Sequence, residues 1–401
     1  TEMLGSYTVP NADGGLGGFN VWRYVDKMGN ECAFYDTSNV VPINLSGGNA
    51  GVNVLDMSDP SQPVLSATLQ TPAMMSPHES LILNTQRGLL MAVLGNAVTY
   101  PGLVDIYDVS ENCLEPVLKS SSLVGLLGHE SGISPDGLTF YTGSPLVPTM
   151  AAIDVSDPGK PALLTFNAAI RAHGISVSDD GNTAYVAVIS PGGTTLPVGP
   201  LTNGVAIMDV SEVQARKAVP MMREISHLFW EGMGAPQFAA PFSVGDKSFL
   251  LAVDEFGFSA VDNIPAARII DVTDPANPRI VSDVRLEVHQ RENFSTFGND
   301  PSAAVPFPGY SAHYCNIPRR VDPKIAACPM GLSGLRVFNI ENPYRPREVA
   351  YFIPPFEGRN QGDTSEPVSK PAFVPERREI WYSDNRGFYV VRLTGNAWPQ
   401  D

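Results

Sequence analysis

The sequence predicts an all-β fold: a seven-bladed β-propeller of four-stranded antiparallel blades, with long loop insertions on one face. Three observations predict it, namely a turn-rich composition, a short phrase that recurs along the chain, and a hairpin pattern between its copies. The 401 residues include 36 glycines and 36 prolines, which indicates many turns and few long helices. A two-sheet sandwich would not explain the regular return of one phrase, whereas a ring of similar blades does.

The recurring phrase is an apolar strand that ends in an Asp-x-Ser turn, as in Asp56-Met-Ser58-Asp59-Pro60. Asp and Ser side chains bond nearby backbone N–H groups, and proline ends a strand ladder. A fixed phrase at variable spacing indicates a repeat unit with loop insertions. The copies are spaced by 52, 46, 55, 62 and 68 residues and are centred on Asp56, Asp108, Asp154, Asp209, Asp271 and Asn339.

A second pattern lies between these phrases. A strand that starts at His173 runs into an Asp180-Gly181 turn and then into a strand at 184–188, and His129 starts the same arrangement. Strand, Asp-Gly turn and strand is a strong hairpin signal. Each unit therefore reads as an inner strand, its hairpin partner, the Asp-Val-Ser strand and an outer strand such as 162–166.

Seven such units are expected, all within one domain that spans residues 1–401. The last unit ends with a strand at 387–393 and has no outer strand after it. The N-terminal segment is therefore expected to complete the last blade and close the ring. The inner strands are expected to begin near Gly18, His78, His129, His173, Gln237, His313 and Val368.

The units differ mainly in loops, the largest at 189–203, 222–236, 254–266 and 288–310. These loops are rich in aromatic residues, which are costly to leave in water. We expect them to gather on one face and shape a pocket for a small, partly apolar or aromatic substrate. The alternative is that they cover the ring or contact a protein partner.

The charge balance narrows the class of partner. The chain has 42 acidic and 26 basic residues, a net charge of −16 at pH 7. Such a surface repels phosphate backbones and anionic lipids, so no nucleic-acid partner is expected. The longest apolar runs are of strand length, well below the roughly 20 residues of a membrane-crossing helix, so no membrane insertion is expected.

The four cysteines indicate an oxidising location. Cys315 and Cys328 flank one short segment and can staple a hairpin, which leaves Cys32 to pair with Cys113. The alternative is four buried thiols in a reducing compartment. Together with the acidic charge and a start at Thr1 that suggests a removed signal peptide, the cysteines predict a secreted or periplasmic protein.

The histidines carry the sharpest functional signal. His78, His129 and His173 each stand 11 residues before the first residue of their partner strand, and His313 stands 12 before Ile325. Inner strands start beside the central channel of a propeller, so four imidazoles from four blades are expected to converge on the axis. Imidazole is the commonest protein ligand for Fe, Cu and Zn, so these four can hold one ion with a position left open. The alternative is that duplication of a structural histidine produced the register.

Two carboxylates follow register histidines and are the candidate catalytic residues. Strand alternation is expected to point Glu79 and Glu130 away from the direction of His78 and His129. They can still accept hydrogen bonds that orient a ligand, or act as general acid and base in a metal-free site.

Four further residues are weaker candidates for substrate binding. Arg319 and Arg320 can bind a carboxylate or phosphate near the channel, and His289 and Trp230 lie in loops that can cover its mouth. The alternatives are a surface arginine pair and ordinary loop residues.

The Asp-Val-Ser-Asp-Pro phrase after an apolar strand resembles that of the LVIVD-repeat proteins, a group of mostly exported bacterial β-propellers. The resemblance covers residues 18–393 and is specific for the fold but not for a function. The family's architecture is similar to that of the selenium-binding protein/methanethiol oxidase propellers, which implies a metal site on the ring axis.

These observations predict an exported propeller with a histidine-ligated Fe, Cu or Zn ion at its centre. We expect a metal-dependent enzyme acting on a small molecule, with oxidoreductase chemistry ahead of lyase chemistry. Two alternatives stay open. One is a non-catalytic binding propeller with a protein or glycan partner, and the other is a metal-independent lyase or hydrolase that uses a histidine with Glu79 or Glu130.

Overall fold

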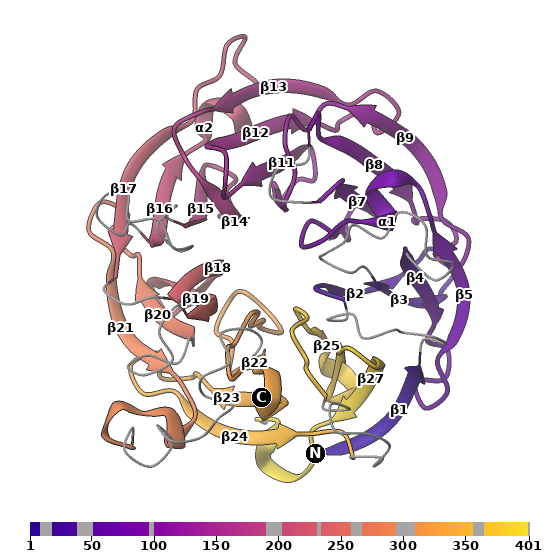
Figure 1. Ribbon diagram of the computed structural model, residues 1–401, viewed down its shortest axis with the longest axis vertical. Helices are drawn as coiled ribbons and strands as arrows, with labels where there is room; N and C mark the ends of the chain where they lie inside the picture. The colour runs from indigo at the N-terminus through magenta and orange to yellow at the C-terminus, as the bar shows by residue number, and fades with distance from the viewer. Residues whose placement is uncertain are drawn as a thin grey trace.

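The computed structural model describes residues 1–8, 18–37, 51–95, 100–189, 203–230, 234–257, 267–293, 309–355 and 365–399. Its strands form seven antiparallel sheets arranged around one axis, which confirms the predicted seven-bladed propeller (Figure 1). Within each sheet the strands follow chain order from the axis outward, apart from the last blade.

The first four blades are β2 (Val21–Val25), β3 (Glu31–Asp36), β4 (Val52–Asp56) and β5 (Val64–Leu69); β6 (Ile82–Asn84), β7 (Leu89–Val93), β8 (Leu103–Asp108) and β9 (Val117–Leu123); β10 (Glu130–Ile133), β11 (Thr139–Ser144), β12 (Thr149–Asp154) and β13 (Ala162–Asn167); and β14 (Ala172–Val177), β15 (Thr183–Val188), β16 (Gly204–Asp209) and β17 (Arg223–Phe229). The last three are β18 (Gly234–Val244), β19 (Lys247–Gly257), β20 (Ala267–Asp271) and β21 (Arg279–Val284); β22 (Ile325–Pro329), β23 (Leu335–Asn339) and β24 (Arg347–Phe352); and β25 (Ala372–Val374), β26 (Glu379–Ser383) and β27 (Gly387–Arg392) with β1 (Glu2–Thr8).

The N-terminal strand closes the ring, as predicted. β1 pairs antiparallel with β27, so that Glu2 lies opposite Arg392 and Thr8 opposite Gly387. β1 is thus the outer strand of the seventh blade and follows the rim of the ring next to β24 (Figure 1). Pairing of the two chain ends gives the last blade the fourth strand that its own segment lacks.

The sixth blade departs from the predicted four strands. Three strands are described there, and the segment before them makes two isolated bridges, from Asn316 to Ala327 and from Val321 to Ser243 of the fifth blade. Pro318 follows the first bridge and has no N–H to continue a ladder. His313 therefore lies on irregular backbone rather than in an inner strand.

The recurring phrase has one structural meaning in all its copies. The backbone N–H two residues after each Asp or Asn donates to that side chain over 2.9–3.1 Å, as Ser58 does to Asp56. A β-bulge precedes each turn by two residues, for example between Val54 and Leu55. The side-chain turn thus ends each third strand at the same place in every unit.

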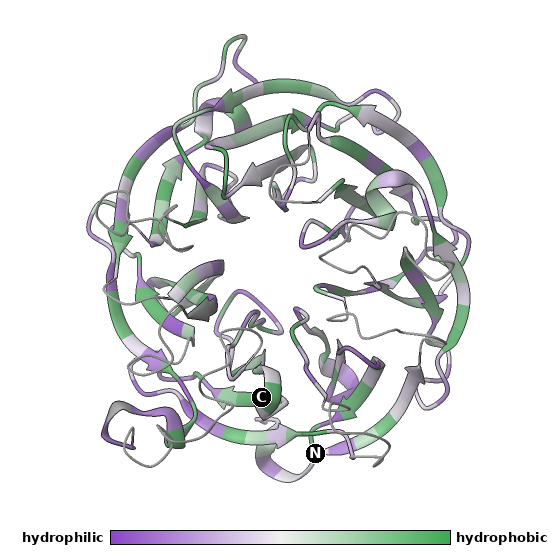
Figure 2. Cartoon of the chain, in the orientation of Figure 1, coloured by the Kyte–Doolittle hydropathy of each residue, from purple (hydrophilic) through white to green (hydrophobic). Residues whose placement is uncertain are grey.

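The hydrophobic core is divided among the spaces between neighbouring blades. One such layer joins Phe34 and Val54 of the first blade to Leu90 of the second, all fully buried. Figure 2 shows hydrophobic residues along the strands and hydrophilic residues in many of the connecting loops. The outer strands are largely exposed, as the alternating pattern of β17 illustrates.

The helices are single turns: α1 (Pro72–Met75), α2 (Ser211–Gln214), and the 3-10 helices η2 (Glu287–His289), η3 (Arg291–Asn293), η5 (Gly331–Ser333), η6 (Pro375–Arg377) and η7 (Gly395–Ala397). Among the described residues, no helix has the length and apolar character needed to cross a membrane.

Both predicted disulfides are present. Cys32 of β3 is joined to Cys113, which follows β8, so this bond links the first blade to the second. Cys315 is joined to Cys328 of β22.

Two of the predicted loop insertions are wrong in their bounds. Most of 222–236 is the outer strand β17 and the start of β18, and β19 continues through Asp254 to Gly257. Alternating exposed and half-buried side chains in β17 mark it as an edge strand, where apolar and charged residues mix. The rest of the predicted insertions falls largely outside the described residues.

Candidate metal centre

Four buried histidines from four blades meet near the axis. The exposed fraction is 8% for His78 and His129, 1% for His173 and 0% for His313. The ring centroids of His78 and His129 are 4.4 Å apart, and those of His129 and His173 are 4.8 Å apart. The Nε2 atoms of His129 and His173 approach to 2.9 Å.

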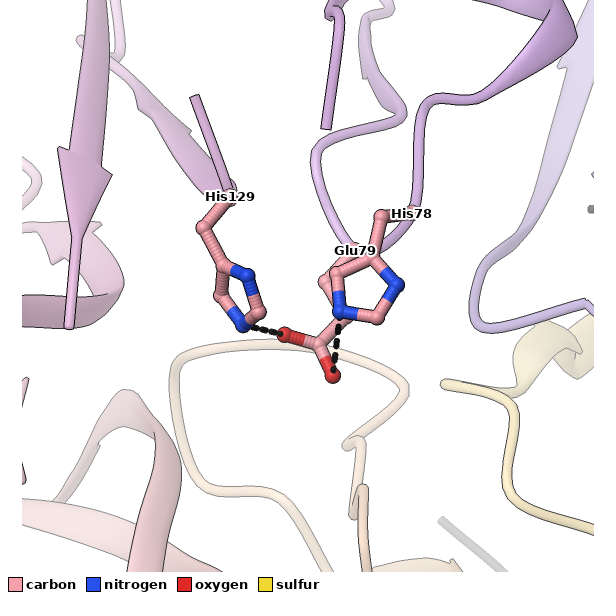
Figure 3. Close-up of side chains that lie close together, drawn as sticks. All are labelled: His78, Glu79 and His129. Atoms are coloured by element: carbon pink, nitrogen blue, oxygen red, sulfur yellow. Dashed lines mark ion pairs between the residues drawn. The ribbon is translucent and has the colours of Figure 1, made fainter. Parts of the chain in front are cut away.

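The carboxylate of Glu79 lies among these histidines. Its Oε2 is 2.9 Å from Nε2 of His129 and 3.3 Å from Nε2 of His173. Its Oε1 is 3.1 Å from Nε2 of His313 and 3.7 Å from Nε2 of His78. Figure 3 shows the rings of His78 and His129 directed at opposite oxygens of this carboxylate.

This position of Glu79 corrects the expectation from strand alternation. Alternation would send Glu79 away from its neighbour His78, yet both side chains reach the centre. The backbone of His78 has a φ of 50°, in the left-handed region, and β6 begins only at Ile82. Alternation applies to extended strand, so it fails here. His313 also has a positive φ, of 20°, and such backbone strain outside glycine is concentrated at functional sites.

The next blade holds two of the rings in a defined tautomer. The Nδ1–H of His173 donates to the backbone oxygen of Pro236 over 2.7 Å, and that of His313 donates to the oxygen of Val368 over 2.7 Å. A neutral ring that donates from Nδ1 presents the lone pair of Nε2 to the axis. A metal-binding histidine is commonly oriented in this way.

Glu255 of β19 is a further member of the site that sequence reasoning missed. Its carboxylate oxygens lie 3.6 Å from Nε2 of His173 and 3.8 Å from Nε2 of His313. Its side chain is 17% exposed, more than Glu79 or any of the four histidines. The available signal was a pair of carboxylates, Asp254 and Glu255, at the end of the apolar run 249–253. Both of them lie in the segment 254–266 that was predicted as a loop.

A buried ion pair braces the strand that carries Glu255. Asp254 accepts two hydrogen bonds from the guanidinium of Arg268, at 2.8 and 2.6 Å. The ring of Trp230 lies 4.0 Å from that guanidinium. Both members of the pair are almost fully buried, so this contact fixes the end of β19 beside the axis.

The electrostatics of the centre are those of charged groups removed from water. Burial lowers the pKa of His78 to about 3. Burial also opposes protonation of His173, but contact with the Glu79 carboxylate prevails and raises the pKa of His173 to about 9. Burial and the charge of Glu79 raise the pKa of Glu255 to about 7. Without a metal, Glu79 and His173 therefore form an ion pair at neutral pH.

Glu130 lies in a second polar group rather than among the four imidazoles. Gln237 donates to Oε2 of Glu130 over 3.3 Å and to the hydroxyl of Tyr314 over 3.0 Å. Burial, together with the charge of Glu79, raises the pKa of Glu130 well above its usual range. Its surroundings therefore favour the protonated form of Glu130, which can donate a proton or a hydrogen bond.

A lysine adjoins this second group. The Nζ of Lys370 lies 4.1 Å from the ring centre of Phe238 and 5.1 Å from that of Trp22. Burial lowers the pKa of Lys370 to about 8, and Glu130 opposes that shift. Aromatic faces on two blades thus stabilise an ammonium group that burial disfavours.

The structure does not bring the four weaker candidates to the histidines. Arg320 bonds the oxygen of Val177, about 13 Å along β14 from His173. Its neighbour Arg319 bonds the oxygen of Asp322. Both arginines follow His313 by several residues. The segment between His313 and Arg320 carries Arg320 to the far ends of β14 and β18, away from His173.

The other two weaker candidates are packed elsewhere. Trp230 is 8% exposed and belongs to the core between the fourth and fifth blades. His289 lies on η2, packs against Tyr310 and lines a cavity of about 390 Å³ with Arg336 and Glu348 of the sixth blade. These positions are explained by packing within and between blades.

The donor atoms at the centre fit a transition metal. Two groups of side chains are placed to hold an ion, one of His78, Glu79 and His129 and one of Glu79, His173 and Glu255. The buried Oε2 of Glu79 faces Nε2 of His129 at 2.9 Å and Nε2 of His173 at 3.3 Å, which places carboxylate and imidazole donor atoms side by side.

Comparison with known proteins identifies the fold alone. No protein-family model matches the chain, and no curated protein matches it. A periplasmic gluconolactonase of Pseudomonas aeruginosa superposes with a TM-score of 0.59 at 15% identity, covering 88% of this chain and 90% of that one. A functionally unknown protein from Desulfotomaculum acetoxidans superposes with a TM-score of 0.55 at 12% identity, covering 88% of this chain and 89% of that one. A chain of a mitotic checkpoint complex superposes with a TM-score of 0.55 at 13% identity, covering 98% of this chain and 94% of that one.

Proposed function

We propose that the axis of this propeller binds a transition metal, Fe, Cu or Zn, and that the protein is a metal-dependent enzyme acting on a small molecule. One observation carries the proposal: imidazole nitrogens from four blades surround one buried carboxylate. Four distant parts of the chain are held together there, against the cost of burying charged groups. A bound cation relieves that cost.

The donor set supports a transition metal over calcium or magnesium. Imidazole is a ligand for Zn, Cu and Fe, whereas Ca²⁺ and Mg²⁺ select oxygen ligands. The residues that would hold the metal are His78, His129, His173 and His313, with Glu79 and Glu255. When bound, the metal would supply Lewis-acid or dioxygen chemistry, and we favour an oxidoreductase.

The protein's own groups would manage protons and orientation. The hydrogen bonds from His173 and His313 to backbone oxygens hold both rings with Nε2 facing the axis. Burial favours the protonated form of Glu130 and lowers the pKa of the nearby Lys370 to about 8. These two groups are suited to hold or pass a proton near the substrate.

We also place the protein in the LVIVD-repeat group and outside the reducing cytosol. The five Asp turns and one Asn turn of the same kind support the first proposal, and the two disulfides support the second. The acidic net charge of −16 agrees with a small-molecule substrate rather than a nucleic acid.

Elemental analysis of the purified protein tests the proposed function. We expect bound Fe, Cu or Zn in the wild type, and a lower metal content in single His129→Ala and His173→Ala variants that keep their circular dichroism spectrum. His227→Ala is the matched control, because His227 is a half-exposed residue on the outer strand β17. Wild-type protein without retained metal, or histidine variants that bind as the wild type does, would overturn the proposal.

A further inference from the structure

The carboxylate of Glu79 lies between the four histidines, and each of its oxygens contacts one histidine on either side. Its Oε2 contacts His129 and His173, and its Oε1 contacts His313 and His78. A single ion equidistant from all four Nε2 atoms would coincide with this carboxylate. An ion that binds without displacing Glu79 must therefore lie to one side of it.

One group lies where the second and third blades meet. His78, Glu79 and His129 offer ligand atoms that all lie within 4.8 Å of one another (Figure 3). Glu79 and Glu130 form a parallel backbone bridge between these blades, so the adjacent His78 and His129 are held in register. This group offers two nitrogens and one carboxylate oxygen.

A second group lies on the side of the fourth to sixth blades. Glu79, His173 and Glu255 also offer ligand atoms within 4.8 Å of one another. His313 joins this group, since its Nε2 is 3.1 Å from Glu79 and 3.8 Å from Glu255. Both His173 and His313 thus face the space between two carboxylates.

We propose that the axis holds two metal ions, with Glu79 as the carboxylate that bridges them. His78 and His129 would complete one site, and His173, His313 and Glu255 would complete the other. Paired sites that share a bridging carboxylate typically hold their ions about 3.5–4 Å apart. The bridging assignment also accounts for a carboxylate with both oxygens buried among imidazole nitrogens.

Counting ions tests this inference, which rests on the proposed function. Metal-free protein is titrated with Co²⁺ and the bound ions are counted by native mass spectrometry. We expect two ions per chain in the wild type and one in Glu255→Gln and in His78→Ala. The matched controls are Glu224→Gln and His227→Ala, which alter an exposed pair on β17 and should keep two ions.

The outcomes separate the two proposals. One ion in the wild type, lost in both variants, would overturn the two-ion centre and leave the metal centre standing, whereas no ion would overturn both. A second readout does not depend on complete folding of the variants. Wild-type protein loaded with Cu²⁺ should show a coupled electron paramagnetic resonance signal. Glu255→Gln should show an isolated Cu²⁺ signal, and an isolated signal in the wild type would contradict the bridge.

Discussion

His129 and His173 are 44 residues apart in the chain, yet their Nε2 atoms are 2.9 Å apart at the centre of the ring. The hydrogen bond from Nδ1 of His173 to Pro236 leaves the Nε2 lone pair of a neutral ring facing His129. Two lone pairs repel at this distance, so a proton or a cation must lie between them. The same contact thus joins two blades and defines the candidate site.

The glycine after His173 should be essential to this contact. A Cβ at Gly174 would lie 2.0 Å from the backbone oxygen of Gln237 and 2.8 Å from Oε2 of Glu130. Gly174→Ala should therefore force the inner strands of the fourth and fifth blades apart and destabilise the fold by about 3 kcal/mol. Urea unfolding and metal content would measure the effect. Gly159→Ala, in an exposed turn with its nearest contact at 3.3 Å, is the control and should be near neutral.

A buried ion pair should stabilise the strand that carries Glu255. Arg268→Met would leave Asp254 ionised and unpaired in the core, at a cost of about 3–5 kcal/mol. Adding Asp254→Leu removes the unpaired charge, so the double variant should regain more than half of the loss. Thermal unfolding of the two variants tests this, and a double variant no more stable than Arg268→Met would contradict it.

Asp26 should make stability depend on pH in acid. Its carboxylate accepts hydrogen bonds from the backbone of Met28, Asn30 and Cys113. Burial raises its pKa, but these hydrogen bonds prevail and lower it in the folded protein. A lowered folded pKa gives stability that is present above the unfolded pKa and lost as the pH falls through the folded one.

Asp26→Asn should therefore lower the free energy of unfolding by about 2 kcal/mol at pH 7. The gap from the wild type should narrow as the pH falls below about 4, where Asp26 begins to take up a proton. Denaturation in urea at several pH values measures the gap. A gap that stays constant down to pH 2 would show that the charge of Asp26 contributes nothing.

The two disulfides should contribute unequally to stability. Cys32 and Cys113 are separated by 81 residues, and Cys315 and Cys328 by 13. Loop-closure entropy predicts a loss of about 4 kcal/mol when the first is replaced by a pair of alanines and about 3 kcal/mol for the second. Chemical denaturation of the two double variants compares them, and a larger loss for the shorter loop would argue against this entropic account.

The fold was open to prediction because its signals are local. An Asp side chain that bonds the N–H two residues later ends a strand wherever it occurs, so six copies reveal six strand ends. Hairpin turns such as Asp180-Gly181 are equally local. The last unit lacks an outer strand, which implies that the N-terminal segment closes the ring. Strand β1 supplies this missing strand by pairing with β27.

The site was open to prediction only in part. The register of His78, His129 and His173 placed them at the same point of three blades, where they lie within ring-contact distance. Glu255 was missed because the length of β19 is set by pairing with β18 rather than by its own residues. Arg320 was misplaced because it lies on irregular backbone after His313, and no local sequence pattern indicates at which end of the channel that backbone terminates.

By itself, then, the sequence determined the repeat, the number of blades and the closing strand, whereas the structure decided that the four cysteines form two disulfides. The first three features follow from backbone turns and short-range spacing. Only the tertiary structure decided that Glu79 turns inward with the histidines and that Glu255 joins them from another blade. The physical reason is that a positive φ at His78 departs from strand alternation, and that Asp254 of β19 is braced by Arg268 of β20, 14 residues away, so no local pattern records either feature.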